Sequence, residues 1–291
     1  MQNIRVIARL DIKGPNLVKG IHLEGLRVLG KPEQFAKYYY ENGADELMYM
    51  DVVASLYERN SLKDIITRTA KEIFIPLTVG GGIRTIDDIR EALRAGADKV
   101  CLNTAAIKTP EIIKEASRIF GSSTIVVAIE AIKQADGAYL AYTDNAREYT
   151  GVEVYEWAQK VEKLGAGEIV LTSVDSEGTG KGFDLELVEK VAQMVSIPVV
   201  AHGGAGNASD IREAVERGAN AVAVASILHY DFMGKSIKDG DYTVEGNTEF
   251  LRSGKEFGHI KPCNLGEIKN YLHDNHVNCR YKKNEAEKND K

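Results

Sequence analysis

Two stretches of the chain are nearly identical: IREALRAGADKV at residues 89–100 and IREAVERGANAV at residues 211–222, 122 residues apart. Each has the apolar spacing of an amphipathic helix that ends at a glycine and is followed by the start of a strand. When residues 81–100 are aligned with residues 203–222, ten of the twenty positions are identical. This duplication predicts a fold built from two equivalent halves, with a chance likeness of two helix–strand units as the alternative.

Eight short apolar runs are predicted as strands. They lack the alternation of a half-exposed strand, and this favours strands buried on both faces, as in a parallel sheet. Helical patterns separate them, and several of these open with Thr, Ser or Asp and close on Gly. The predicted strands are residues 3–11, 45–51, 75–79, 99–103, 124–130, 168–174, 197–202 and 221–226. Eight such units in succession predict an α/β fold, a (β/α)₈ TIM barrel with a half-barrel internal repeat, and a doubly wound sheet is the alternative.

The length of 291 residues fits one barrel of this kind. We expect a single domain over residues 1–281, with a long, polar and Gly-rich insertion at about residues 231–262. The tail at residues 282–291 is charged and lacks apolar anchors, so we expect it to be disordered.

The composition excludes several classes of protein. A net charge of −6 argues against nucleic-acid binding, which favours a basic face. No apolar run is long enough to cross a membrane, and the first residues lack the pattern of a signal peptide, so we expect a cytoplasmic protein. Cys101, Cys263 and Cys279 have no metal or redox spacing, and the six histidines are dispersed. We therefore expect reduced thiols, no metal and no cofactor.

Glycine pairs follow two of the predicted strands, at the ends where the active sites of TIM barrels lie. Glycines let backbone N–H groups approach an anion, although they also serve tight turns. Because the repeat duplicates the arrangement, we expect two phosphate-binding sites and a substrate with a phosphate at each end. One site is predicted at Gly81, Gly82, Asn103 and Thr104, and the other at Gly203, Gly204 and Ser226.

Carboxylates end several predicted strands, at Asp11, Asp51, Glu130 and Asp175. Asp11 and Glu130 end the first and fifth strands, so the repeat places them on opposite sides of the barrel. Opposed carboxylates suit general acid–base catalysis, whereas a strand-end carboxylate that only caps a loop is the alternative. Lys19, expected in the first βα loop, is either a phosphate ligand or a solvated surface lysine.

Four charged residues fall near the starts of predicted strands, namely Arg5, Glu46, Lys99 and Glu168. The repeat pairs Glu46 with Glu168. Charges at this end of an apolar barrel must be paired, so they predict a ring at the bottom of the core. The ring is either a structural layer of salt bridges or a polar gate into the barrel axis.

Several motifs together resemble the HisF family, the cyclase subunit of imidazole glycerol phosphate synthase. They are RLDIKGPNLVKG, ADELMYMD, TVGGGI, GADKVCLNTAA, GAGEIVLTSVDSEGT and GGAG, within residues 3–231, and the likeness resumes near 264–281. The resemblance implies a lyase of histidine biosynthesis that binds two phosphates. Such an enzyme converts a bisphosphorylated aminoimidazole ribonucleotide (PRFAR) and ammonia into imidazole glycerol phosphate and an aminoimidazole carboxamide ribonucleotide (AICAR).

The resemblance also assigns roles to residues of this chain. It implies that Asp11 and position 130 form the acid–base pair, that the four strand-start charges form the ammonia gate, and that Asp98 faces a partner. Thr172, Asp175 and Gly178, within or beside the same motifs, join the predicted substrate-binding residues. The chain has no glutaminase machinery of its own, so a HisH-like glutaminase is implied as a separate partner that supplies ammonia at the barrel bottom.

The sequence departs from the usual family pattern at four positions near the mouth, where it has Arg9, Glu130, Glu177 and His202. These departures keep open a HisF-like branch that relays ammonia for acetamidino-sugar synthesis on surface polysaccharides. A second alternative is a non-catalytic subunit that binds and activates a glutaminase. A single-chain phosphosugar isomerase with two phosphate sites is disfavoured, because it needs no ammonia gate.

Overall fold

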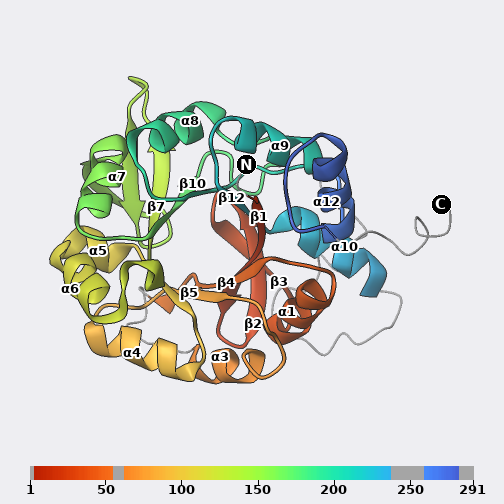
Figure 1. Ribbon diagram of the computed structural model, residues 1–291, viewed down its shortest axis with the longest axis horizontal. Helices are drawn as coiled ribbons and strands as arrows, with labels where there is room; N and C mark the ends of the chain where they lie inside the picture. The colour runs from red at the N-terminus through yellow and green to blue at the C-terminus, as the bar shows by residue number, and fades with distance from the viewer. Residues whose placement is uncertain (1–2, 55–61, 237–258, 282–291) are drawn as a thin grey trace.

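The computed structural model describes residues 3–54, 62–236 and 259–281. Eight parallel strands follow one another round a closed barrel, and the last pairs with the first (Figure 1). Their order is β1 (Arg5–Lys13), β4 (Glu46–Asp51), β5 (Leu77–Gly80), β6 (Lys99–Leu102), β7 (Ile125–Lys133), β10 (Glu168–Ser173), β11 (Val199–His202) and β12 (Ala221–Val224). The predicted TIM barrel is confirmed, and each predicted strand overlaps one of these.

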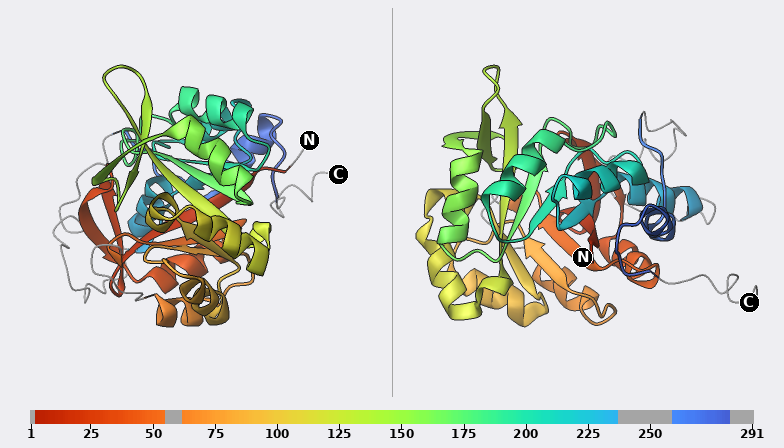
Figure 2. Two further views of the ribbon diagram at one scale, coloured as in Figure 1. Left: turned by 90° about the vertical axis from the view of Figure 1, so that its left-hand side faces the viewer. Right: turned by 45° about the horizontal axis from the view of Figure 1, so that its top comes forward.

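Helices surround the barrel (Figures 1 and 2). The outer helices are α1 (Pro32–Glu41), α3 (Lys63–Thr69), α4 (Ile86–Ala95), α6 (Glu111–Phe120), α7 (Val154–Lys163), α8 (Leu185–Met194), α9 (Ala208–Glu216) and α12 (Leu265–Asp274). Shorter or mouth-side elements are α5 (Thr104–Lys108), the 3₁₀ turn η1 (Ser122–Thr124) and α10 (Ser226–Ser236). No helix in the described ranges is long and apolar enough to cross a membrane.

Two β-hairpin extensions, which the sequence analysis did not predict, rise from equivalent places in the two halves. In one, β1 continues into β2 (Asn16–Ile21) and β3 (Glu24–Gly30). In the other, β7 continues into β8 (Tyr139–Thr143) and β9 (Glu148–Glu153), and the β7–β8 hairpin projects beyond the helices in both views of Figure 2. Lys19 therefore lies in a strand, β2, rather than in a loop.

The apolar core has two parts, because side chains of a barrel strand alternate between the axis and the helices. Val6 and Ala8 of β1 belong to the outer cluster under the helices. Ile7 belongs to the inner cluster, with small and medium side chains such as Val126 and Ala221. The same alternation directs the odd-numbered residues of β1 towards the barrel axis, and this determines where its charged side chains lie.

The duplication is visible in the helix caps of the repeated segments. Thr85 begins α4 with a capping box in which its side chain and that of Asp88 exchange hydrogen bonds with backbone N–H groups. Asn207 and Asp210 form the same capping box at the start of α9. Each satisfies backbone donors that a helix start leaves unpaired. The two copies of the sequence repeat thus fold into equivalent units.

The glycines that open these two loops are also equivalent. Gly81 has φ +92° and Gly203 has φ +93°. A Cβ atom on Gly81 would overlap the carbonyl oxygen of Asp51, and one on Gly203 would overlap that of Ser173. Each glycine is therefore needed for close packing against the neighbouring strand end, in addition to any contact with an anion.

Part of the predicted domain arrangement lies outside the described residues. The tail at 282–291 and most of the insertion at about 231–262, residues 237–258, are among them. The first residues of that insertion, 231–236, form the end of α10.

We predict that Gly81→Ala lowers the free energy of unfolding by at least about 3 kcal/mol, because it combines a left-handed backbone with a backbone clash. Gly43 is the matched control: its φ is +92°, the same as that of Gly81, yet a Cβ there would meet nothing within 4 Å. Gly43→Ala should cost only about 1–2 kcal/mol, the cost of the left-handed backbone alone. Urea unfolding of both variants measures the difference, and equal losses would contradict the packing role.

Candidate active site

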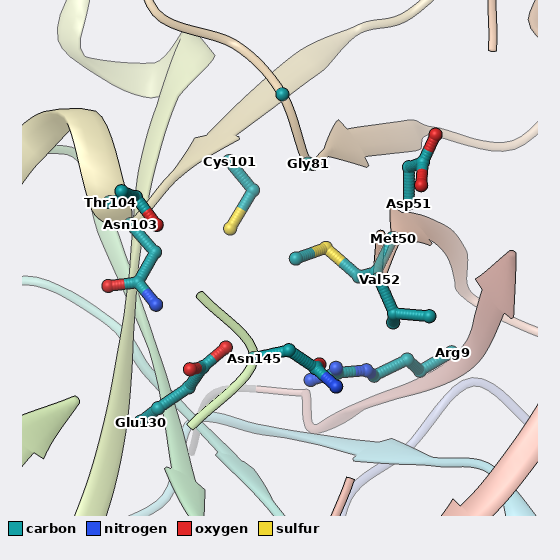
Figure 3. Close-up of a pocket in the computed structure, with 11 residues that line it drawn as sticks. Arg9, Met50, Asp51, Val52, Gly81, Cys101, Asn103, Thr104, Glu130 and Asn145 are labelled. Carbon is teal, nitrogen blue, oxygen red and sulfur yellow. The ribbon is translucent and has the colours of Figure 1, made fainter. Parts of the chain in front are cut away.

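A cavity opens at the C-terminal end of the barrel, where TIM-barrel active sites lie. Its volume is about 50 Å³, enough for a few water-sized molecules. Residues from β1, β4, β6 and β7 line it, and Figure 3 shows their side chains converging on it. Of the predicted site residues, it brings together Glu130, Gly81, Gly82, Asn103, Thr104 and Asp51.

Glu130 lies near the end of β7 and is 8% exposed. One carboxylate oxygen, Oε2, accepts a hydrogen bond of 2.7 Å from the backbone N–H of Ala146. Burial raises the pKa of Glu130 to about 7, although Ala146, the guanidinium of Arg9 and the side chain of Asn103 oppose this rise. The carboxyl can therefore gain or lose a proton near neutral pH.

Asp11 is also buried, but its surroundings act in the opposite direction. Its Oδ1 accepts a hydrogen bond of 2.9 Å from Nε of Arg9, and Nζ of Lys19 lies 3.9 Å from Oδ2. Burial alone would raise the pKa of this carboxyl, but Arg9 and Lys19 outweigh it and hold the pKa below its usual value. Asp11 therefore remains ionised at neutral pH.

The two carboxylates lie on opposite sides of the barrel, as predicted. Asp11 is on β1 and Glu130 on β7, with β4, β5 and β6 between them on one side and β10, β11 and β12 on the other. Their environments separate their pKa values, and this is the arrangement expected of an acid–base pair.

Arg9 extends across the barrel interior; the sequence analysis placed it near the mouth but did not predict its contacts. From β1 it reaches His202 on β11, with 3.1 Å between Nη1 and Nδ1, and Thr172 on β10 at 3.5 Å. An arginine only donates hydrogen bonds, so Nδ1 of His202 must accept and carries no proton. Burial, together with Arg9 and Lys19, holds the pKa of His202 well below its usual value, and the ring is neutral. Three of the four residues that depart from the family pattern thus surround the barrel mouth.

Lys19 and the fourth departure, Glu177, form a buried ion pair with each other. Because its amine is held by the carboxylate of Glu177, Lys19 is buried rather than solvated. The backbone of Gly178, φ +74°, packs against that of Gly20 in β2. The segment after β10 therefore lies directly against the first hairpin.

The first predicted phosphate site lines the cavity. Asn103 is the residue before α5, and its Nδ2 donates to the carbonyl of Tyr142 at 3.3 Å. Its Oδ1 is buried and has no hydrogen-bond partner within the described residues. Thr104 contacts Asp144, with 3.4 Å between Oγ1 and Oδ1. The unpaired Oδ1 of Asn103 is an acceptor, and a ligand in the cavity could donate a hydrogen bond to it.

The second predicted phosphate site lies at the ends of the neighbouring strands β11 and β12, away from the lining of this cavity. Gly203 and Gly204 follow β11, and the carbonyl of Gly204 accepts from the N–H of Gly182 at 2.8 Å. Ser226 is the first residue of α10 and is buried. A helix start beside two glycines is a favourable place for an anion.

The other two predicted carboxylates have capping contacts. Asp51 lines the cavity, and its Oδ1 accepts from the N–H of Val53 at 3.1 Å. Asp175 is exposed, and its Oδ2 accepts from the N–H of Lys133 at 2.9 Å. Of the two, only Asp51 faces the cavity.

The four strand-start charges form a closed ring at the opposite end of the barrel. Arg5 contacts Glu46 at 2.7 Å and also contacts Glu168. Lys99 contacts the same two carboxylates, at 3.0 Å and 3.2 Å. The charges alternate in sign, so each is compensated on two sides. Burial disfavours the charge on Arg5, but Glu168 and Glu46 raise its pKa.

Asp98 is exposed at the same end of the barrel, next to Lys99. Its Oδ2 accepts from the N–H of Leu77 at 2.8 Å. In the other half Asn220 accepts from the N–H of Val199 at 2.9 Å. Asp98 therefore has a structural contact, and its exposed carboxylate also faces outward.

The sequence analysis missed several residues of the mouth. Met50, Cys101 and Asn145 line the cavity, and Ala146 holds Glu130. The run TDNAREY around Asn145 carried a usable signal, because Asp and Asn favour turns between strands. The contacts of Arg9 with β10 and β11 could not be predicted, because no local sequence pattern indicates a contact between residues far apart in the chain.

Comparison with known proteins agrees with this geometry. A family model described as "Histidine biosynthesis protein" matches residues 5–233. The chain is 61% identical over 206 residues to "Imidazole glycerol phosphate synthase subunit HisF" of Legionella pneumophila, which covers 71% of this chain and 97% of the relative. The protein of the same name from Thermococcus onnurineus is 45% identical over 248 residues, covering 85% and 94%. That from Alkaliphilus metalliredigens is 45% identical over 228 residues, covering 78% and 90%. The chain belongs to the HisF family of imidazole glycerol phosphate synthase subunits.

Proposed function

We propose that this protein is the cyclase subunit of an imidazole glycerol phosphate synthase, a lyase of histidine biosynthesis. It combines ammonia with PRFAR and releases imidazole glycerol phosphate and AICAR. One observation carries the proposal: two opposed, buried carboxylates with separated pKa values lie at the mouth of a barrel whose other end is closed by a ring of charges. An acid–base site and an ammonia entrance are both needed for this reaction.

Asp11 and Glu130 carry the proton transfers. Ammonia loses protons as its nitrogen forms new bonds to carbon, and the leaving groups gain them. Asp11, held ionised by Arg9, accepts hydrogen bonds from the attacking nitrogen. Glu130, with a pKa of about 7, donates a proton to a leaving group and recovers it afterwards.

The two glycine sites hold the ends of the substrate. Gly81, Gly82, Asn103 and Thr104 bind the phosphate nearest Glu130, and Gly203, Gly204 and Ser226 bind the other. Thr172 near the end of β10, with Asp175 and Gly178 in the segment that follows, completes the binding surface. Lys19 binds substrate only after it leaves Glu177, because the two are paired when the mouth is covered.

Ammonia comes from a HisH-like glutaminase docked on the end of the barrel that carries the charge ring. Arg5, Glu46, Lys99 and Glu168 act as the gate through which ammonia enters the axis. The exposed carboxylate of Asp98 lies beside this gate and contacts the partner. We also propose that the complex works in the cytoplasm, where its phosphorylated substrate is made.

The other candidate functions have less support. A phosphosugar isomerase has no use for the charge ring. A purely binding subunit has no use for a buried glutamate whose pKa is about 7. The relatives reported above carry the name of the histidine enzyme, and so favour it over sugar amidination.

We predict that PRFAR turnover by the purified chain, with ammonium salt as the nitrogen source, falls at least about 100-fold in both Asp11→Asn and Glu130→Gln. In the wild type, kcat/KM at a fixed concentration of un-ionised ammonia should decrease above pH 7, because Glu130 must be protonated to act as an acid and has a pKa of about 7. Steady-state kinetics from pH 6 to 9 measure both effects.

Asp136→Asn is the control for this experiment, since Asp136 is exposed in the turn between β7 and β8 and only accepts from the N–H of Ala138 at 3.0 Å. A folded wild-type protein with no turnover would contradict the proposed reaction. Turnover that survives in Glu130→Gln would contradict only the role of Glu130.

For the gate, we predict that Lys99→Met lowers glutamine-dependent turnover, measured with a HisH-type partner, at least about tenfold relative to ammonium-dependent turnover. The substitution leaves Glu46 and Glu168 paired with Arg5 alone and disturbs the entrance, whereas added ammonia can enter at the mouth. The ratio of the two rates is the measurement.

Lys133→Met removes a matched salt bridge, 2.9 Å to Glu186, on the exposed hairpin. It should leave the ratio unchanged. An equal fall of both rates in Lys99→Met would show that the ring serves only stability.

A further inference from the structure

The tips of two turns from opposite halves of the barrel meet over the mouth. The first joins β2 to β3 at His22 and Leu23, and the second joins β8 to β9 at Asp144, Asn145 and Ala146. Because β2 and β8 run antiparallel to β1 and β7, both turns return to the level of the mouth. Nδ2 of Asn145 donates to the carbonyl of Leu23 at 2.8 Å.

Both turns have unfavourable backbone conformations. His22 and Leu23 have φ values of 53° and 62°, and Asp144, Asn145 and Ala146 have 53°, 60° and 63°. Left-handed conformations cost most residues about 1–2 kcal/mol each, and Asp and Asn less. Leucine and alanine gain nothing locally from this geometry, so contacts elsewhere must stabilise it.

Tertiary contacts at the mouth supply this stabilisation. Leu23 is 2% exposed, and its N–H donates to Oε2 of Glu177 at 2.9 Å. Its carbonyl accepts from Asn145, so the peptide groups on both sides of Leu23 are bound. The next residue of the second turn, Ala146, donates its N–H to Glu130. The β8–β9 turn therefore contacts both the β2–β3 turn, which covers the mouth, and the buried carboxylate of Glu130.

We propose that Asn145 is a positioning residue that couples covering of the mouth to the protonation of Glu130. The side-chain amide of Asn145 holds the β2–β3 turn over the barrel mouth by its hydrogen bond to Leu23. The N–H of the next residue, Ala146, holds the carboxylate of Glu130. Covering the mouth and setting Glu130 in its protonated, acid form are then one event. The inference rests on the role proposed above for Glu130.

The charged and polar groups that face Glu130 come from several elements. The N–H of Ala146 in the second turn, Arg9 on β1 and Asn103 after β6 favour its ionised form, whereas Asp144 in the second turn disfavours it. Cys101 on β6 lines the same cavity. The first turn carries His22, whose Nδ1 lies 2.9 Å from the carbonyl of Val174, and the ion pair of Lys19 with Glu177.

The direction of the coupling follows from linkage. Burial is the largest cause of the raised pKa of Glu130, about 7, and outweighs the opposing hydrogen bond from Ala146, so the covered state binds its proton more tightly than an open, solvated state does. Protonation therefore favours the covered state below pH 7, and this advantage disappears as the pH rises through 7. The β2–β3 turn should open more often at pH 8 than at pH 6.

Amide hydrogen exchange of the ligand-free chain tests this without reference to turnover. After correction for the intrinsic pH dependence of exchange, protection of residues 20–25 should fall about tenfold from pH 6 to pH 8 in the wild type. Glu130→Gln, which keeps His22 and all the other groups, should show high protection at both values. Asn145→Asp and the neutral Asn145→Gly, both tolerant of a left-handed backbone, should lower protection about fivefold at pH 6.

Asn42→Asp is the matched control, because Nδ2 of Asn42 also donates to a backbone carbonyl, that of Tyr38, at 2.8 Å, on an exposed helix end. It should leave residues 20–25 unchanged. In the kinetic assay, the pH above which kcat/KM falls should move lower in Asn145→Gly and not in Asn42→Asp.

Unchanged protection in both Asn145 variants would contradict the proposed role of Asn145 in holding the β2–β3 turn. Faster exchange with the same pH dependence in wild type and Glu130→Gln would overturn the coupling. Absence of PRFAR turnover would overturn the proposed function alone. The exchange measurements would still decide whether Asn145 holds the β2–β3 turn and whether covering is coupled to the protonation of Glu130.

Discussion

The alternation of side chains along β1 is the constraint on which the rest of the site depends. Arg5, Ile7, Arg9 and Asp11 lie on one side of this strand, and closure of the barrel turns that side towards the axis. Charged side chains of β1 therefore lie at both ends of the barrel axis, with the apolar side chain of Ile7 between them. A shift of β1 by one residue would bury Val6 and Ala8 in the axis instead and remove both charged layers.

Burying charges at the mouth requires that each be compensated. Arg9 meets this requirement by binding Asp11 with one side of its guanidinium and Thr172 and a neutral His202 with another. The same guanidinium that keeps Asp11 ionised is only a secondary influence at Glu130, where burial dominates. Two carboxylates in one barrel mouth thus acquire different proton affinities, because Arg9 and Lys19 favour the charge of Asp11 whereas burial dominates at Glu130.

The two hairpins add a second layer to this arrangement. Their turns lie over the mouth in left-handed conformations that are locally unfavourable for Leu23 and Ala146, and their contacts with Glu177, Asn145 and Glu130 stabilise them. The cavity of about 50 Å³ lies beside these turns, and Asn145 lines it. Conformational strain and the raised pKa of Glu130 are therefore concentrated at the same contact.

The sequence by itself determined the barrel, its two equivalent halves, the charge ring and the opposition of Asp11 to Glu130. These follow from local patterns, because strand length, helix caps and the spacing of repeats are set by neighbours in the chain. The tertiary structure alone decided that Lys19 pairs with Glu177, that Arg9 reaches His202, and that Asn145 holds Leu23. These contacts join residues more than a hundred positions apart, and the protonation of each group depends on burial and on charges that only the folded barrel brings together.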